Sequence, residues 1–233
     1  MKSSTRLKGA VFSLATDYSY KYLVFSLLLL MVLYPFVEKY SAAQGILTLL
    51  MLFTLVSAAW AASRTRRQFL IVGLAAVLVF IGRWTIFFVP LTYIALADSL
   101  LALVFFAYVS GIVFKDIFAH DDRITIDTIY QSIGVYLLLG VTWAFAYVSL
   151  ELFAPGSFTI GIDVAVQKDL NLHKFIYFSF VTMTTLGYGD ITPVTPAAGS
   201  LSYVQAVVGQ IYLTVLVARL VGMHISARAK QSD

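Results

Sequence analysis

The chain has 233 residues, of which 60% are hydrophobic and only 12% charged, and its mean hydropathy is +0.88. A soluble domain of this length could not bury so much apolar surface, so the composition excludes a soluble protein and indicates an integral membrane protein. The absence of cysteine excludes disulfides and thiolate sites, and the net charge of +4 comes from basic residues at the ends of hydrophobic segments, where they fit membrane anchoring rather than nucleic-acid binding.

Six hydrophobic runs approach the roughly 20 residues needed to cross the hydrocarbon core of a bilayer. In chain order, these predicted spans cover Tyr22–Val37, Ala43–Ala62, Phe69–Val89, Leu91–Phe114, Ile129–Phe153 and Ala198–Met223. Between the last two, the segment Asn171–Thr184 is apolar but too short to span, which indicates a re-entrant helix. The expected fold is therefore an all-α membrane protein with six transmembrane helices per subunit and one re-entrant segment.

Basic residues are distributed unevenly between the two sides of this topology. One side carries Lys2, Arg6, Lys8, Arg64, Arg66, Arg67, Lys115, Arg123, Arg228 and Lys230, and the other carries Lys39, Lys168 and Lys174. Cytoplasmic loops carry the excess of lysine and arginine. We therefore expect both termini in the cytoplasm, a location in the plasma (inner) membrane, and a re-entrant segment that enters from outside.

The stretch TTLGYGD, residues 184–190, follows the re-entrant segment and places two glycines around a tyrosine. Non-helical backbone at membrane depth is tolerated only where it is buried in protein or lines a water-filled cavity. If all carbonyls of such a strand face one side, the backbone dihedrals must alternate in handedness, and Gly187 and Gly189 can supply the positive φ values. The resulting ladder of oxygens could replace the water around a dehydrated monovalent cation. Because one strand cannot encircle an ion, several copies of the chain are expected around a symmetry axis.

At these residues the chain resembles the potassium channel family, whose selectivity filter usually reads TVGYG. The preceding FSFVTMT and the following ITP resemble the pore helix and filter exit of that family, and the order of helix, pore loop and helix extends the resemblance over about Ile129–Met223. The first four spans match the six-transmembrane prokaryotic members only in number. Leu186 stands where valine is commoner, and its side chain is expected to point away from the ions, so that potassium preference is retained.

The resemblance implies a homotetramer with one filter strand from each subunit. It further implies that K⁺ binds the carbonyl oxygens of the first four filter residues. The filter residues would be Thr185, Leu186, Gly187, Tyr188 and Gly189. The implied partners are thus K⁺ ions, three further copies of the chain and membrane lipids, with no nucleic acid.

Two acidic residues lie near the expected outer mouth. Asp190 could concentrate cations there, and the resemblance implies that it accepts a hydrogen bond from an aromatic donor, here Tyr177. Ordinary aromatic packing of Tyr177 is the alternative. Glu151, near the outer end of the fifth span, is expected either to accept from the first amides of the sixth helix, around Ala197–Gly199, or to be solvated at the interface.

The sixth span is expected to line the inner pore. Gly209 lies 24 positions after Thr185, which matches the hinge glycine of the family. A residue without a side chain weakens a helix and permits close packing, so helix packing alone is the alternative interpretation. Gln210 is interpreted as the one strongly polar side chain at mid-helix and is expected to face the cavity.

The first four spans have the number, but not the arginines, of a voltage sensor. The fourth span has no arginine at every third position, and its only charge is Asp98. Arg83 in the third span and Asp98 lie seven and eight residues from Pro90, so an antiparallel hairpin would bring them level as an intramembrane ion pair. A structural pair is the leading interpretation, and a single residual sensing charge is the alternative. Voltage gating is therefore expected to be weak or absent.

The predicted organisation has five parts. They are a cytoplasmic N-terminal segment (1–21), a four-helix bundle that resembles a voltage sensor without its arginines (22–114), a cytoplasmic linker (115–128), a pore domain (129–223) and a cytoplasmic tail (224–233). So short a tail leaves no room for a C-terminal ligand-sensing domain in this chain.

Passive conduction of K⁺ through a channel is the function that this pattern favours. A potassium transport subunit is one alternative, although a transporter with four pore loops in one chain would need more filter copies and more length. A non-conducting membrane regulatory partner is another, although it would not need an intact filter. An enzyme is not indicated, because no cluster of Ser, His and acidic residues, metal site or cofactor loop converges on these spans.

Overall fold

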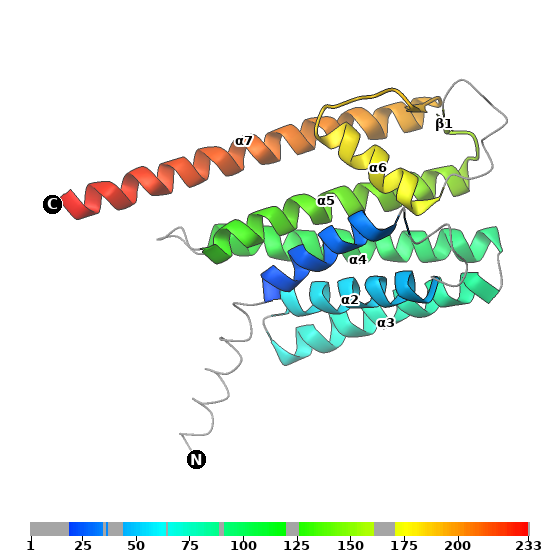
Figure 1. Ribbon diagram of the computed structural model, residues 1–233, viewed down its shortest axis with the longest axis horizontal. Helices are drawn as coiled ribbons and strands as arrows, with labels where there is room; N and C mark the ends of the chain where they lie inside the picture. The colour runs from blue at the N-terminus through cyan, green and yellow to red at the C-terminus, as the bar shows by residue number, and fades with distance from the viewer. Residues whose placement is uncertain are drawn as a thin grey trace, which may run out of the picture.

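The computed structural model describes residues 19–34, 36, 44–63, 65–88, 91–119, 126–160 and 171–232. Most of these residues are helical (Figure 1). The first described helix, called the N-terminal helix below, covers Ser19–Tyr34. It is followed by α2 (Gln44–Ala61), α3 (Arg66–Phe88), α4 (Thr92–Ala119), α5 (Ile126–Phe153), β1 (Phe158–Ile160), α6 (Leu172–Met183), β2 (Ile191–Pro193) and α7 (Pro196–Ser232).

Within the described residues, four helices are long and apolar enough to cross a bilayer, namely α3, α4, α5 and α7. The N-terminal helix and α2 are apolar but shorter. Helix α6 has 12 residues, and at about 1.5 Å per residue it is too short to span. A mostly helical, multi-pass membrane protein is thus supported, with a short helix between α5 and α7, whereas the re-entrant path of that helix, six spans and four subunits stay predictions.

The helices are arranged in layers (Figure 1). Helices α6 and α7 form one side, α4 and α5 the middle, and α2 and α3 the other side, with α6 in contact with both α5 and α7. In the middle layer the rings of Phe106 and Phe145 stack with 5.5 Å between their centroids. The N-terminal helix packs on α5, where Leu23 and Val24 lie beside Gly134. The core therefore joins the N-terminal helix and α4 directly to α5. The four helices before α5, from the N-terminal helix to α4, are called the front helices below.

A short antiparallel sheet interrupts the expected all-α fold. Strand β1 pairs with β2, with Phe158 opposite Pro193 and Thr159 opposite Thr192. Three-residue strands carry too little alternation to stand out in a sequence, and the pairing depends on a contact between distant parts of the chain.

Two helix starts follow directly from local sequence. At α3, the Gln68 amide donates to Thr65 Oγ1 (3.2 Å) and Gln68 Oε1 accepts from the Thr65 amide (3.1 Å), which is a capping box. At α7, Thr195 Oγ1 accepts from the Ala198 amide (3.3 Å), and Pro196 occupies the first helical position, where its missing N–H costs nothing.

The cytoplasmic linker predicted at 115–128 is helical at both ends. Helix α4 continues to Ala119 and α5 already begins at Ile126, so only residues 120–125 lie outside the described part. Polar contacts with the N-terminal helix accompany these extra turns: Tyr20 donates to Asp116 (3.1 Å), and Lys21 lies 3.7 Å from Asp127. Helix α7 likewise continues to Ser232, through the predicted tail. Apart from residues 19–21, the predicted N-terminal segment lies outside the described residues.

Two glycines let α6 approach its neighbours closely. A Cβ at Gly140 of α5 would lie 2.3 Å from the ring of Phe180, and one at Gly209 of α7 would lie 2.4 Å from the Met183 side chain. Both Phe180 and Met183 belong to α6. Helix α6 therefore packs between α5 and α7 at positions where neither helix carries a side chain.

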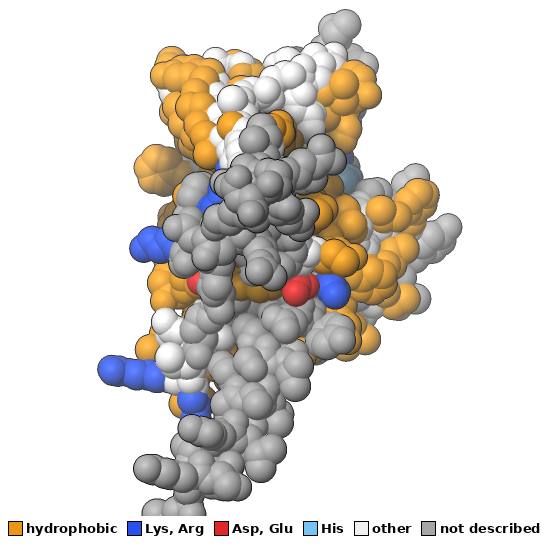
Figure 2. All heavy atoms as spheres, turned by 90° about the vertical axis from the view of Figure 1, so that its left-hand side faces the viewer, with side chains coloured by type: hydrophobic (Ala, Val, Ile, Leu, Met, Phe, Trp, Pro, Cys, Tyr) orange, Lys and Arg blue, Asp and Glu red, His pale blue; other side chains and the backbone are white. Residues whose placement is uncertain are grey.

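Large apolar side chains cover much of the outer surface. Figure 2 shows hydrophobic side chains over the upper and lateral parts of one face, with few charged ones among them. On α2 and α3, Leu49, Leu70 and Leu74 are each more than 60% exposed. Such exposure costs free energy in water but not in lipid, where the helices satisfy their own backbone groups.

The close contact between α5 and α6 can be tested by adding one methyl group at Gly140. Gly140→Ala should lower the free energy of unfolding by about 1–3 kcal/mol, because the new Cβ overlaps the Phe180 ring. The measurement is thermal unfolding of the purified protein in detergent. Gly111→Ala on α4, where a Cβ meets nothing within 4 Å, is the matched control and should unfold like the wild type. Equal stability of both variants would contradict a tight contact between α5 and α6.

Candidate functional site

The TTLGYGD stretch is hydrogen-bonded to the C-terminal end of α6. The amides of Leu186 and Gly187 both donate to the Val181 carbonyl (2.9 and 3.4 Å), and the Thr185 amide donates to Thr182 (3.1 Å). The hydroxyl of Thr184, the helix C-cap, donates to Phe180 (2.7 Å). The N–H groups of residues 184–187 are thus turned back toward the helix that precedes them.

The carbonyls of the same stretch are left without partners. Among the described residues, no carbonyl from Thr185 to Gly189 accepts a hydrogen bond, and every residue from Thr184 to Asp190 is exposed in the single chain. Unpaired backbone acceptors at membrane depth are costly unless water or another ligand reaches them. The site therefore offers a row of oxygens to a ligand outside the chain.

The backbone handedness alternates along this row. Gly187 and Gly189 have φ values of 56° and 78°, as the sequence predicts, and Thr185 has a φ of 61°. Leu186 and Tyr188 lie between them with negative φ. Thr185 is the one non-glycine residue in the described part with positive φ, and the sequence analysis did not identify it, because only glycine signals this conformation in a sequence.

The outer end of the stretch is fixed to α6. Tyr177 donates to Asp190 (2.7 Å), so the predicted hydrogen bond is present, and the ring of Tyr177 is parallel to that of Tyr188 with centroids 6.5 Å apart. The hydrogen bond to Asp190 raises the pKa of Tyr177 to about 12. A raised pKa keeps the hydroxyl protonated at neutral pH, and the bond would be lost only as the pH rises from about 10 toward that value.

Glu151 has different partners from those expected. Its carboxylate accepts from the amides of Gly156 (2.8 Å) and Phe158 (3.1 Å), in the turn that leads from α5 to β1. The prediction that it accepts from the start of the sixth helix is therefore wrong. The reason is local: the chain turns sharply after α5, with Gly156 at a φ of 86°, and this places unpaired amides beside the last turn of that helix.

A buried polar cluster connects the three helices around the site. Gln205 of α7 has no exposed surface. Its amide nitrogen donates to the Ser179 carbonyl (3.0 Å) and hydroxyl (2.6 Å), its oxygen accepts from Tyr147, and Ser179 Oγ lies 2.6 Å from the Gly140 carbonyl. Buried polar groups stabilise a structure only when such partners are complete. The cluster thus fixes α6 to α5 and α7.

The sequence analysis missed Gln205 and named Gln210 as the one strongly polar side chain at mid-helix, which is wrong. The sequence did contain a signal for the burial of Gln205. The buried positions of α7 include Ala198, Ser202, Gln205, Gly209 and Tyr212, which recur at intervals of three and four residues. In a membrane helix, a stripe of small and polar residues faces protein, whereas the larger apolar residues face lipid.

The two residues predicted for the inner pore are both near the site. Gly209 packs against Met183, and α7 continues through it as a helix, so the packing alternative is present in the structure and the hinge stays a prediction. Gln210 is exposed, and its amide nitrogen lies 3.3 Å from the Met183 carbonyl at the end of α6.

The predicted intramembrane ion pair is present between α3 and α4. Arg83 Nη2 lies 3.0 Å from Asp98 Oδ2, and the Asp98 side chain is 1% exposed. Gly82 makes room for it, since a Cβ there would lie 2.6 Å from Asp98 Oδ1. The guanidinium also lies 5.7 Å from the ring centroid of Phe145. The pair therefore touches α5, which is the helix that carries Tyr147 and Glu151.

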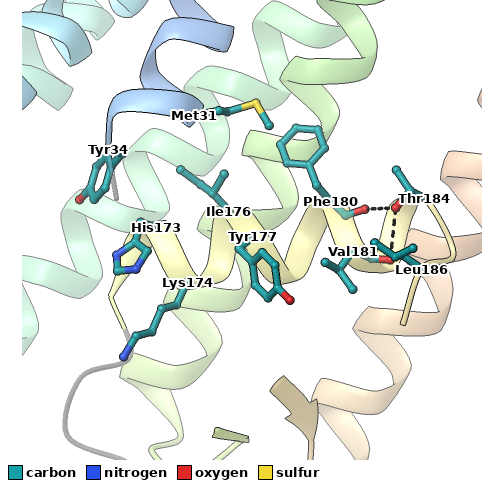
Figure 3. Close-up of a pocket in the computed structure, with 10 residues that line it drawn as sticks. All are labelled: Met31, Tyr34, His173, Lys174, Ile176, Tyr177, Phe180, Val181, Thr184 and Leu186. Carbon is teal, nitrogen blue, oxygen red and sulfur yellow. Dashed lines mark hydrogen bonds between the residues drawn. The ribbon is translucent and has the colours of Figure 1, made fainter. Parts of the chain in front are cut away.

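One flank of the site is uncovered. A cavity of about 470 Å³ lies between the N-terminal helix and α6 (Figure 3). Met31 and Tyr34 line it from the N-terminal helix, Tyr177 and Phe180 from α6, and Leu186 from the TTLGYGD stretch. The Leu186 side chain is 54% exposed. Figure 3 shows it at the end of the row of α6 side chains, so apolar surface next to the stretch is left open in one chain.

Comparison with known proteins shows that the C-terminal part of the chain is similar to ion channels. Residues 135–225 match a family model described as "Ion channel". A two pore potassium channel of Oryza sativa subsp. japonica is 36% identical over 86 residues, which cover 37% of this chain and 16% of the rice protein. The inward rectifier potassium channel Kirbac3.1 of Paramagnetospirillum magnetotacticum is 33% identical over 86 residues, which cover 35% and 24%.

A third relative is covered over more of its length. The LctB protein of Bacillus caldotenax is 29% identical over 100 residues, which cover 42% of this chain and 74% of that protein. Of the two potassium channels named above, by contrast, the chain spans a quarter of the length or less. No solved structure matches the chain significantly. The matched family is one of ion channels and not a class of enzymes.

The buried polar cluster can be tested with two glutamines on one helix. Gln205→Met should lower the free energy of unfolding by about 1–3 kcal/mol, because the buried Tyr147 hydroxyl loses its glutamine acceptor and Ser179 loses the two hydrogen bonds that the glutamine amide donates. Gln210→Met is the matched control: its side chain is exposed and makes one long hydrogen bond, so a change below about 0.5 kcal/mol is expected. Thermal unfolding in detergent measures both, and a larger effect at position 210 would contradict the assignment.

The ion pair is suited to a double-mutant cycle. Arg83→Gln should destabilise the protein by about 3–5 kcal/mol, because it leaves the Asp98 carboxylate buried without a counter-charge. Asp98→Asn added to that variant should recover most of the loss, since no buried charge remains. Chemical unfolding in detergent would measure the cycle. Strictly additive losses would mean that the two side chains do not stabilise the protein as a pair.

Proposed function

We propose that the whole chain is a potassium-selective channel that conducts K⁺ passively. Residues 135–225 match a family model described as "Ion channel", and part of the chain is similar to two potassium channels. The observation that carries the proposal is the alternation of φ at Thr185, Gly187 and Gly189. With the amides of residues 184–187 bonded to α6, the carbonyls of Thr185, Leu186, Gly187 and Tyr188 are available to replace the water around K⁺, the transported ion.

Four copies of the chain complete the proposed pore. One strand supplies oxygens on one side of an ion only, so closure around the axis requires several identical strands. The exposure of every residue from 184 to 190 and the open flank beside Leu186 support a neighbouring subunit at this place. The homotetramer is the arrangement that the resemblance to potassium channels favours.

The residues around the filter have roles in this proposal. Asp190, held by Tyr177, concentrates cations at the outer mouth. The C-terminal end of α6 directs its partial negative charge toward the centre of the pore. Below it, Gln210 faces the inner cavity, and Gly209 serves as the point where α7 can bend when the pore opens.

The front helices supply a lipid-facing frame rather than a strong voltage sensor. The Arg83–Asp98 pair neutralises both charges within the bundle, so neither charge is free to move through the membrane field. We place the channel in the plasma (inner) membrane, with both termini in the cytoplasm and the re-entrant segment entering from outside. Membrane lipids that contact these apolar helices are further partners in this proposal.

The proposal is tested by potassium flux into liposomes that contain the purified chain. The wild type should pass K⁺ and exclude Na⁺, and Gly187→Ala should lower K⁺ flux at least about tenfold, because alanine resists positive φ by about 1–2 kcal/mol per filter strand. Gly199→Ala is the control, since this helical glycine has no neighbour within 4 Å of the new Cβ.

The outcomes separate the candidate functions. Equal flux in the wild type and Gly187→Ala, or equal passage of Na⁺ and K⁺, would contradict a selective channel. No flux at all, together with a stable complex with another membrane protein, would favour a non-conducting partner. Flux that requires a second protein would favour a transport subunit. Cross-linking of the reconstituted protein into dimers, trimers and tetramers measures the subunit number.

A further inference from the structure

The last turn of α6 ends in four carbonyls, of which the filter stretch uses three. The carbonyls of residues 180–182 accept hydrogen bonds from the amides of residues 184–187. The fourth carbonyl, that of Met183, accepts from no backbone amide among the described residues. Its partner is the side-chain amide of Gln210 on α7, at 3.3 Å. Gln210 therefore caps the one carbonyl at the end of α6 that the filter stretch does not use.

Close packing of α7 against the end of α6 makes this contact possible. Gly209 precedes Gln210, and a Cβ at Gly209 would lie 2.4 Å from the Met183 side chain and 3.1 Å from the Met183 carbonyl oxygen. Because position 209 carries no side chain, the carbonyl stays open toward α7 and the next residue reaches it. The contact between Met183 and Gln210 thus lies where the two helices approach most closely.

The hydrogen bond also decides which atom of the Gln210 amide faces away from the chain. A carbonyl accepts only from a donor, so Nε2 points at Met183 and Oε1 lies on the other side of the amide. Gln210 is exposed, and no described residue donates to its Oε1. The partially negative end of α6 is capped at this carbonyl, and a side-chain oxygen outside the helix becomes the acceptor instead.

Gln210 belongs to a polar stripe on an otherwise apolar surface of α7. Between residues 204 and 218, every exposed residue is apolar except Gln210 and Thr214. The two lie four positions apart and so share one face of the helix. The Thr214 hydroxyl donates to the Gln210 carbonyl (2.8 Å), which leaves its lone pairs as acceptors on that face. Polar groups on a membrane helix face water or protein rather than lipid, so this stripe offers acceptors to a water-filled space.

We propose that Gln210 forms a binding site for a hydrated inorganic cation in the inner cavity and determines which cations bind there. In the proposed tetramer four Gln210 amides surround the axis, each held by a Met183 carbonyl and each with its Oε1 open to the cavity. Amide oxygens accept hydrogen bonds from the water shell of an ion such as Mg²⁺, which gives up its waters reluctantly. The inference rests on the proposed channel function and adds to it the ligand class of the cavity.

A quaternary ammonium ion has the opposite requirements. Its surface is apolar and carries no donor for an amide oxygen, so it binds better where apolar side chains line the cavity. Amide oxygens at position 210 therefore favour hydrated inorganic cations, whereas an apolar side chain there favours organic ones. Opposite changes in the affinity for these two kinds of cation are the signature of the site.

The first test exchanges the amide for an apolar side chain of similar size. Single-channel K⁺ currents of the full-length chain are recorded in planar bilayers, with Mg²⁺ or tetrabutylammonium added to one side at a time. In Gln210→Met, the Mg²⁺ concentration that halves the current should rise about tenfold. The corresponding tetrabutylammonium concentration should fall about threefold. Unchanged values, shifts of both in the same direction, or a wild type that Mg²⁺ does not block would overturn the site.

Two further variants serve as a control and as a test of the contact with Met183. Ile211→Leu changes an exposed neighbour on a different face of α7, and both ions should block it as they block the wild type. Gln210→Asn keeps an amide but is one methylene shorter, too short to span the present contact with Met183. Mg²⁺ block of this variant should be weaker than that of the wild type. Equal block would contradict the positioning of the amide by Met183.

The two proposals fail in different ways. A wild-type protein without K⁺ current under any condition would overturn the channel function and this inference with it. A wild type that conducts, combined with a Gln210→Met variant that both ions block like the wild type, would overturn the cation site and leave the channel function intact. Block is measured as a fraction of the open-channel current, so a smaller amount of active protein does not imitate either shift.

Discussion

The structure depends on one constraint, which is that a backbone segment with free carbonyls has to be held in place without hydrogen bonds to those carbonyls. The carbonyls of residues 185–189 accept no hydrogen bond within the described chain, and the amides of residues 185–187 donate to α6. Such a segment cannot stabilise itself as a helix or sheet does. Its conformation therefore has to come from the parts around it, and much of the packing near α6 serves that purpose.

Three kinds of contact supply this support. Gly140 and Gly209 allow α6 to sit close to α5 and α7, the Gln205 cluster joins all three helices through complete hydrogen bonds, and β2 ties the exit of the filter to β1. Each is short-range and specific in shape, because hydrogen bonds and close backbone approach fix direction as well as distance. These contacts lie where a small displacement would alter the spacing of the carbonyls.

The helices before α5 are linked to the region around α6 through α5 and α7. Arg83 lies over the ring of Phe145, and Phe145 stacks on Phe106 of α4. Phe114 of α4 contacts Tyr212 of α7, with 6.2 Å between the ring centroids. A rearrangement of α3 and α4 would therefore act on both α5 and α7. These contacts give the helices before α5 a route to the proposed pore that does not require charges to move in the membrane field.

The sequence by itself determined the membrane class, the helix order, the short α6, the glycines at positive φ and the pairing of Arg83 with Asp98, because these follow from hydrophobic length, glycine stereochemistry and the cost of charge in lipid. It also carried the Tyr177–Asp190 bond, through resemblance to a family. Only the tertiary structure decided the partners of Glu151, the burial of Gln205, the positive φ of Thr185 and the strands β1 and β2. Each of these depends on which distant backbone groups come to lie beside a side chain, and a hydrogen bond over a few ångströms leaves no periodic trace in the chain that forms it.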